Sequence, residues 1–168
     1  RKAGGALSVL STPGFGTRME VFLPVDLGAL EDGDTALGTA SLEGALILVV
    51  DDETHVADVL GKMLERVGAE VAVVDDPALA LEAVTEDPDA WSVVITDYDM
   101  PGLNGGTLAA KMREVRPDLP IVMVTALARR LDDPHVAAGA VDAVFAKPAK
   151  IGQLSEKLAA LIEAREEE

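Results

Sequence analysis

Apolar and polar side chains alternate along the first part of the chain. Two alternating runs, residues 6–11 and 18–23, flank the sequence Pro-Gly-Phe-Gly-Thr at residues 13–17. Alternation with a period of two is typical of a half-buried strand, and the Pro- and Gly-rich sequence predicts a turn. We therefore predict a β-hairpin over residues 1–24. It needs a partner surface, because two strands alone are marginally stable in water.

Beyond residue 44 the pattern changes to short apolar runs separated by segments with helical periodicity. The runs are rich in β-branched residues and predict strands at residues 45–50, 69–74, 91–96, 120–124 and 141–146. Strands that are apolar almost throughout and alternate with helices are typical of a parallel sheet covered on both faces. The predicted fold class is α/β, a doubly wound five-stranded parallel sheet preceded by the N-terminal β-hairpin.

The helical segments differ in how clearly their apolar positions repeat. The first helical segment has six apolar residues that its spacing places on one face: Val56, Val59, Leu60, Met63, Leu64 and Val67. Pro77 begins the second, the third covers residues 105–115, and the last covers residues 151–164. The fourth is interrupted at Asp133-Pro134, so we expect roughly one to two turns, with Asp133 as the N-cap.

Residues 25–44 contain four glycines among Asp, Glu, Thr and Ala, with little periodicity. This composition predicts a linker. The expected organisation is then a hairpin at 1–24, a linker at 25–44 and an α/β domain at 45–168. Because the chain opens with Arg1 and its first methionine is Met19, we expect it to be a piece of a longer polypeptide.

Composition narrows the classes of function. The chain has 168 residues, of which 49% are hydrophobic, and only one Trp, one Tyr and three Phe, so the core must be aliphatic. A net charge of −16 without a basic patch argues against a nucleic-acid partner. The absence of cysteine excludes disulfides and thiolate metal sites. The longest apolar stretch, 45–50, is too short to span a bilayer, and we expect a cytoplasmic protein without membrane contact.

Polar side chains follow four of the five predicted strands. Asp51 and Asp52 follow the first, Asp97 the third, Thr125 the fourth and Lys147 the fifth. The carboxyl ends of parallel strands share one edge of the sheet, where ligands bind in this class of fold. Singly, these residues have ordinary explanations, such as a helix cap for Thr125 or a solvated charge for Lys147. Their joint placement instead favours one functional site.

Three carboxylates, a hydroxyl and an ammonium group suit a divalent cation and a phosphoryl group. Mg²⁺ takes oxygen ligands, and Asp52 and Asp97 could supply them if their strands are neighbours. Crowded carboxylates repel one another, which favours a bound cation. A carboxylate can also act as a nucleophile and form an acyl phosphate. Lys147 can neutralise phosphoryl charge, and Thr125 can donate a hydrogen bond to a phosphoryl oxygen.

The sequences around these residues are specific. They read Leu-Val-Val-Asp-Asp-Glu at 48–53, Thr-Asp-Tyr-Asp-Met-Pro-Gly-Leu-Asn-Gly at 96–105, Val-Thr-Ala at 124–126, and Lys147-Pro148. Together they make residues 46 to about 164 resemble a two-component receiver domain of the CheY-like family. The resemblance implies the flavodoxin-like receiver fold and a phosphoacceptor module that is not itself an enzyme.

The resemblance also implies a role for each acidic residue. Asp97 would accept a phosphoryl group from a phosphohistidine and become an aspartyl-phosphate. Mg²⁺ would be held by Asp52, Asp97 and the backbone carbonyl of Asp99, with Asp51 acting through water.

For the other motifs the resemblance implies that Thr125 moves to meet the phosphoryl group and that Lys147 pairs with it. The Lys147-Pro148 peptide bond would be cis. One position departs from the family, in which Tyr or Phe stands three residues before the lysine. That position is Val144 here, and Phe145 follows it on the opposite side of the strand. We therefore expect the chemistry of the family with a different readout.

The first 24 residues also resemble part of a known family. The residues that carry this resemblance are Gly4-Gly5, Leu7, Val9, Ser11, the turn at 13–17, Val21 and Leu23-Pro24. They resemble the end of a histidine kinase ATP-binding domain, with a generic glycine-rich hairpin as the alternative. The two resemblances imply the C-terminal receiver of a hybrid histidine kinase. Its partner would be its own kinase core or a histidine phosphotransfer protein, and a homodimer is possible.

Two other functions compete with this interpretation. Asp97-Tyr98-Asp99 resembles the Asp-x-Asp motif of haloacid-dehalogenase-type phosphatases, but in that family the nucleophile ends the first strand and the acidic pair comes last. Here the acidic pair comes first. The other alternative is an interaction domain that works without phosphorylation, which the changed position at Val144 supports and the complete acidic and lysine set opposes.

Overall fold

The computed structural model describes residues 6–12, 16–22, 40–128 and 131–166. The chain divides into two compact units, Arg1–Ala36 and Leu37–Glu168. In the first unit, β1 (Ala6–Thr12) and β2 (Gly16–Phe22) pair in antiparallel register, as predicted for a hairpin. The predicted turn residues 13–15 and most of the predicted linker, up to residue 39, lie outside the described residues.

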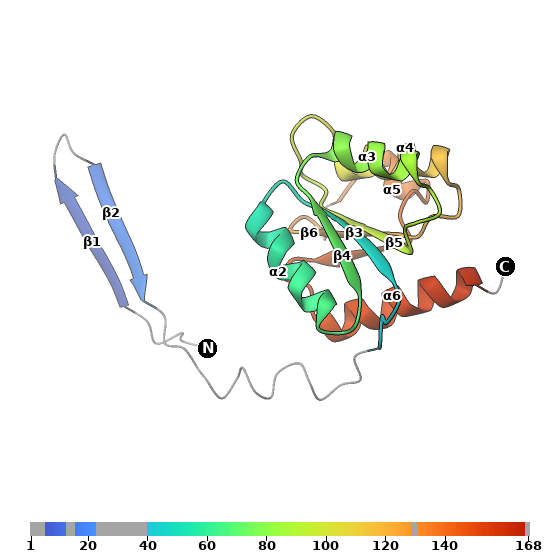
Figure 1. The fold of residues 1–168 in the computed structure, drawn as a ribbon. Coiled ribbons are helices and arrows are strands. Elements are labelled where there is room, and N and C mark those ends of the chain that lie inside the picture. The colour runs from blue at the N-terminus through green and yellow to red at the C-terminus, as the bar shows by residue number, and fades with distance from the viewer. Residues whose placement is uncertain (1–5, 13–15, 23–39, 129–130, 167–168) are drawn as a thin grey trace. The chain divides into compact units, whose positions relative to one another are not determined.

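A parallel five-stranded sheet forms the centre of the second unit (Figure 1). Its strands are β3 (Leu46–Val50), β4 (Glu70–Val74), β5 (Val93–Thr96), β6 (Ile121–Thr125) and β7 (Ala143–Ala146). The spatial order is β4-β3-β5-β6-β7, and every neighbouring pair is parallel. β4 lies on one side of β3, and β5, the next strand along the chain, lies on the other side. The direction in which successive strands are added to the sheet therefore reverses at β3. The predicted fold class is confirmed.

Helices cover both faces of this sheet (Figure 1). One face carries α2 (Thr54–Glu65) and α6 (Ile151–Glu166); the other carries α3 (Pro77–Glu86), α4 (Gly105–Val115) and α5 (Pro134–Ala137). Successive strand residues alternate between two aliphatic cores: Ile47 and Val49 pack with α2 and α6, whereas Leu48 and Val50 pack with α3 and α4. Burial on both faces explains why the strands are almost continuously apolar. Within the described residues, no helix is long and apolar enough to cross a membrane.

The buried face of α2 differs from the prediction. Val56 and Val59, which the spacing placed on the apolar face, are 37% and 60% exposed. The fully buried residues are Ala57, Gly61 and Leu64, and the predicted residues Leu60, Met63 and Val67 pack against the same core. The absence of a side chain at Gly61 lets the helix approach β4, since a Cβ there would lie 3.3 Å from a methyl group of Val73. Four of the six predicted residues therefore lie on the core side, and the prediction was wrong at Val56 and Val59, because small residues such as Ala57 and Gly61 contribute little to an apolar pattern.

The remaining helix predictions are confirmed, including the short α5. It is a single turn with Asp133 as its N-cap, and the Asp133 carboxylate accepts hydrogen bonds from the backbone of His135 at 2.9 Å and of Val136 at 3.2 Å. None of the four residues of α5 is buried. The turn therefore depends on its cap more than on hydrophobic packing.

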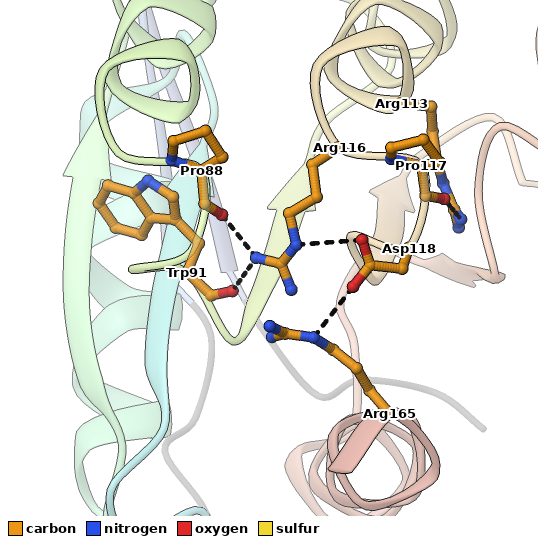
Figure 2. Close-up of polar contacts among 7 residues, drawn as sticks. All are labelled: Pro88, Trp91, Arg113, Arg116, Pro117, Asp118 and Arg165. Carbon is orange, nitrogen blue, oxygen red and sulfur yellow. Dashed lines mark hydrogen bonds and ion pairs between the residues drawn. The ribbon is translucent and has the colours of Figure 1, made fainter. Parts of the chain in front are cut away.

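A buried arginine, Arg116, joins several loops at the end of the sheet where the strands begin (Figure 2). Arg116 directly follows α4, is only 4% exposed, and donates through Nη1 to the carbonyl oxygens of Pro88 at 2.6 Å and Trp91 at 2.8 Å. Its Nε lies 3.5 Å from the Asp118 carboxylate, which also pairs with Arg165 of α6 at 3.1 Å. One guanidinium thus joins the loop before β5, the loop before β6 and, through Asp118, the last helix.

We predict that Arg116→Met lowers the free energy of unfolding by about 2–4 kcal/mol, because it leaves two carbonyls without their charged donor. Equilibrium unfolding in urea measures the change. The matched control is Arg165→Met, which removes one exposed ion pair with Asp118 and should cost less than about 1 kcal/mol. Equal losses for the two variants would contradict the central role of Arg116.

Candidate functional site

Three carboxylates meet where the winding of the sheet reverses. Asp51 and Asp52 follow β3, and Asp97 follows β5. The backbone ladder continues one residue beyond the strands, since Asp51 N–H donates to the Val74 carbonyl at 3.2 Å and Asp97 N–H donates to the Val50 carbonyl at 2.8 Å. Each carboxylate offers an oxygen within 4.8 Å of the other two. The site therefore lies at the position where ligands bind in open parallel sheets.

Two of these carboxylates are buried, Asp51 with 4% exposure and Asp97 with 7%. Oδ1 of Asp51 accepts a hydrogen bond from the Glu53 backbone at 3.0 Å. Oδ1 of Asp97 is buried with no hydrogen-bond partner. A buried carboxylate oxygen without a partner is costly, and three carboxylates at this separation repel one another. Both features fit a hard divalent cation, whose ligands are oxygen atoms.

Lys147 supplies the positive charge of the site. Its Nζ lies 2.6 Å from Asp51 Oδ2 and 3.2 Å from Asp97 Oδ2. Burial alone would lower the pKa of Lys147, but the hydrogen bonds and charges of Asp51 and Asp97 outweigh it and raise the pKa above its ordinary value. The backbone N–H of Lys147 donates to the Thr125 carbonyl at 3.0 Å, and the Lys147-Pro148 bond is cis, as predicted. The lysine is thus a permanently charged partner of both aspartates.

The two other predicted residues lie nearby with separate contacts. Thr125 ends β6 and is 1% exposed, and its hydroxyl oxygen accepts a hydrogen bond from the Leu127 backbone at 3.2 Å. Asp99 is exposed in the loop between β5 and α4. The participation of its backbone carbonyl in metal binding stays a prediction.

The loop after Asp97 folds closely against the start of α4. Gly105 donates its N–H to the Tyr98 carbonyl at 2.9 Å, and a Cβ at Gly105 would collide with the carbonyl oxygen of Asp97. The Thr96 hydroxyl donates to that same carbonyl at 2.8 Å. The sequence motif includes Gly105, but the close contact with the Asp97 backbone was not predicted, although a glycine that begins a helix is a signal of close backbone approach.

Tyr98 makes a contact that the sequence did not predict. Its hydroxyl donates to Asp133 Oδ2 at 3.2 Å, and Asp133 is only 5% exposed. Partial burial raises the pKa of Tyr98, and the neighbouring Asp133 carboxylate raises it further. The two residues are 35 positions apart, so periodicity and local motifs carry no signal of this pair.

The aromatic residue near the lysine points away from α5. Phe145 packs with the core shared by α2 and α6, on the face of the sheet opposite α5. Val144 pairs with Met123 across the strands. The prediction that Phe145 does not replace an aromatic residue at position 144 is confirmed.

This fold and this grouping of acids with a lysine define a response-regulator-type domain. The family model described as "Response regulator receiver domain" matches residues 47–159, which is more than half of the chain. The chain belongs to this family, and its α/β unit is a receiver domain of two-component signalling.

Individual relatives agree with this assignment. The chain is 37% identical over 82 residues to the two-component response regulator ARR14 of Arabidopsis thaliana, covering 49% of this chain and 22% of that protein. It is 28% identical over 119 residues to the sensor protein TorS of Escherichia coli, covering 71% of this chain and 13% of TorS. The chain therefore spans less than a quarter of either relative.

Among solved structures, the fold is similar to the receiver domain of sensor histidine kinase PA1611 from Pseudomonas aeruginosa. The TM-score is 0.65 at 25% identity, over 71% of this chain and 98% of that domain. That structure has a magnesium ion coordinated in its active site cleft.

We predict that Gly105→Ala lowers the free energy of unfolding by about 3 kcal/mol, because the new methyl group meets the Asp97 backbone, which cannot retreat without moving the site. Urea unfolding measures the loss. Gly61→Ala is the control: its methyl group would meet only side-chain atoms of Val73 and Val71. It should stay within about 1 kcal/mol of the wild type, since alanine also favours the helix. A wild-type stability for Gly105→Ala would contradict the close approach.

We expect Tyr98, the only tyrosine of the chain, to ionise above the ordinary tyrosine pKa. Ultraviolet absorbance of the phenolate follows the titration, with the denatured chain as reference. Because the folded-state pKa is raised, the stabilisation is present below the ordinary pKa and is lost as the pH rises through the folded value. Asp133→Asn should lower the pKa of Tyr98, whereas Asp58→Asn on the exposed side of α2 should not. Equal shifts in both variants would count against the contact.

Proposed function

We propose that Asp97 is the phosphoacceptor of this receiver domain and takes a phosphoryl group from a phosphohistidine. The observation that supports this most directly is the state of the Asp97 carboxylate. One oxygen lies 3.2 Å from the Lys147 ammonium group, and the other is buried without a partner beside Asp51 and Asp52. Such a carboxylate is held in place by the lysine, and its second oxygen has no donor from the described residues.

In the proposed reaction, an Asp97 oxygen forms a bond to phosphorus while the phosphorus–nitrogen bond of the phosphohistidine breaks. The imidazole leaves as the neutral donor histidine after taking up a proton, and the product is an aspartyl-phosphate. Such a transfer needs alignment and neutralisation of charge more than covalent help from the protein. Lys147, already adjacent to Asp97, would pair with a phosphoryl oxygen, and the Thr125 hydroxyl would donate a hydrogen bond to another.

The residues present fit a magnesium ion. We propose that Asp52, Asp97 and the backbone carbonyl of Asp99 hold Mg²⁺, with Asp51 acting through water. The support is the set of three carboxylates within 4.8 Å, whose charge Lys147 offsets only in part. When bound, the ion would neutralise the charge of the transferring phosphoryl group.

We further propose that the chain is part of a hybrid histidine kinase, with residues 1–24 from the ATP-binding domain, 25–44 as linker and 45–168 as receiver. The support is the antiparallel hairpin and the similarity to the sensor protein TorS and to the receiver domain of sensor histidine kinase PA1611. The phosphodonor would be the kinase core of the same protein or a histidine phosphotransfer protein in the cytoplasm. The fragment would act as phosphoacceptor, and kinase activity would reside in the parent protein.

We predict that phosphoramidate with Mg²⁺ adds a single phosphoryl group to the chain, as measured by intact mass. The adduct should require Mg²⁺ and disappear in Asp97→Asn, because the amide is not a nucleophile for this transfer. Asp58→Asn, an exposed aspartate on α2, is the matched control and should be phosphorylated like the wild type.

Two results would contradict the proposal. If neither phosphoramidate nor beryllofluoride modifies the wild type, an interaction domain independent of phosphorylation becomes the better interpretation. Continuous phosphate release from unrelated phosphomonoesters would instead favour a phosphatase of the haloacid dehalogenase type.

A further inference from the structure

On the face of the sheet that carries α5, position 144 lacks the Tyr or Phe that the family resemblance led us to expect. That position holds Val144, and Phe145 packs on the opposite face. The aromatic side chain that contacts the N-cap of α5 is Tyr98, which lies in the loop after β5. It directly follows Asp97 in the chain.

The backbone of Tyr98 is held between the site and α4. Its carbonyl oxygen accepts hydrogen bonds from Met100 N–H at 3.2 Å and from Gly105 N–H at 2.9 Å. These bonds fix the residue while its hydroxyl extends to Asp133 Oδ2. The hydroxyl of Tyr98 therefore reaches Asp133 from a backbone that is bonded to the start of α4 and continuous with Asp97.

The Asp133 carboxylate is enclosed on three sides. Oδ2 accepts from Tyr98, and Oδ1 accepts from the first backbone N–H groups of α5. On the third side lies Gly106 of α4, where a Cβ would stand 2.5 Å from Oδ1. Since no residue of α5 is buried, this carboxylate is the main constraint on where the helix begins.

We propose that the hydrogen bond from Tyr98 to Asp133 is a latch that holds α5 in the unphosphorylated receiver and is released when Asp97 is phosphorylated. The proposal rests on the phosphoacceptor function of Asp97. The latch adjoins the proposed phosphoacceptor, because Tyr98 directly follows Asp97 in the chain and its carbonyl is bonded to the start of α4. A shift of the Asp97–Tyr98 backbone on phosphorylation draws the Tyr98 hydroxyl away from the Asp133 carboxylate and loosens the cap of α5.

Coupling between two sites is reciprocal, so a bond that favours the unphosphorylated state must oppose binding of a phosphoryl mimic. Tyr98→Phe removes the hydroxyl and keeps the ring. Titration with beryllofluoride and Mg²⁺ should show about fivefold tighter binding to this variant, the effect of one hydrogen bond of ordinary strength. Hydrogen exchange at the His135 and Val136 amides should be slow in the free wild type. It should be about fivefold faster both in the wild type with beryllofluoride and in free Tyr98→Phe.

A second variant tests the latch from the other side. Gly106→Ala displaces the Asp133 carboxylate without altering Tyr98, and it should speed the same amide exchange. Asp58→Asn is the control, because this exposed aspartate of α2 lies on the opposite face of the sheet from the latch. It should match the wild type in exchange and in beryllofluoride affinity.

The latch is overturned if Tyr98→Phe leaves affinity and exchange unchanged, or if it weakens binding of beryllofluoride. It is also overturned if the wild type binds beryllofluoride while exchange at α5 stays constant, and the phosphoacceptor function then survives. If the wild type binds no beryllofluoride and accepts no phosphoryl group, both proposals fall together.

Discussion

The repulsion among three carboxylates is the constraint on which the rest of this receiver depends. Asp51, Asp52 and Asp97 lie within 4.8 Å of one another, and Lys147 offsets only part of their charge. Two of the three are buried, where unbalanced charge is most costly. Such a grouping persists only if the scaffold is rigid enough to oppose it, and the two aliphatic cores on either side of the sheet provide that rigidity.

The topology of the sheet then decides which residues meet. Asp51 and Lys147 are 96 positions apart in sequence, yet their side chains touch, because strands β3, β5, β6 and β7 all end at the same edge. At the other end of the strands, Arg116 joins the loops that precede β5 and β6 (Figure 2). The charged network at one edge and the buried arginine at the other hold the same strands from both ends.

Much of this arrangement follows from the sequence, because strand ends, caps and parallel topology have strong local signals. The bounds of α4, the cap at Asp133 and the grouping of Asp51, Asp52 and Asp97 were all predictable in this way. The exposed face of α2 was not fully predictable from the sequence, because Ala57 and Gly61 pack against the sheet without adding to an apolar pattern.

Contacts between side chains distant in sequence were also beyond prediction. Tyr98 with Asp133, and Arg116 with the carbonyls of Pro88 and Trp91, have no period and no motif. They arise only when the fold brings loops together, and a single sequence does not reveal which loops will meet.

The uneven distribution of burial suggests where a receiver of this kind can change shape at low cost. α4 has five buried residues, three of which (Leu108, Ala109 and Met112) belong to the core on its face of the sheet, whereas α5 has none. Displacing α4 would expose apolar surface, and that cost scales with the area uncovered. Displacing α5 breaks a few hydrogen bonds around one carboxylate, each of modest net strength. A change of charge at Asp97 is therefore best transmitted through α5, the element whose position is set by polar contacts next to the site.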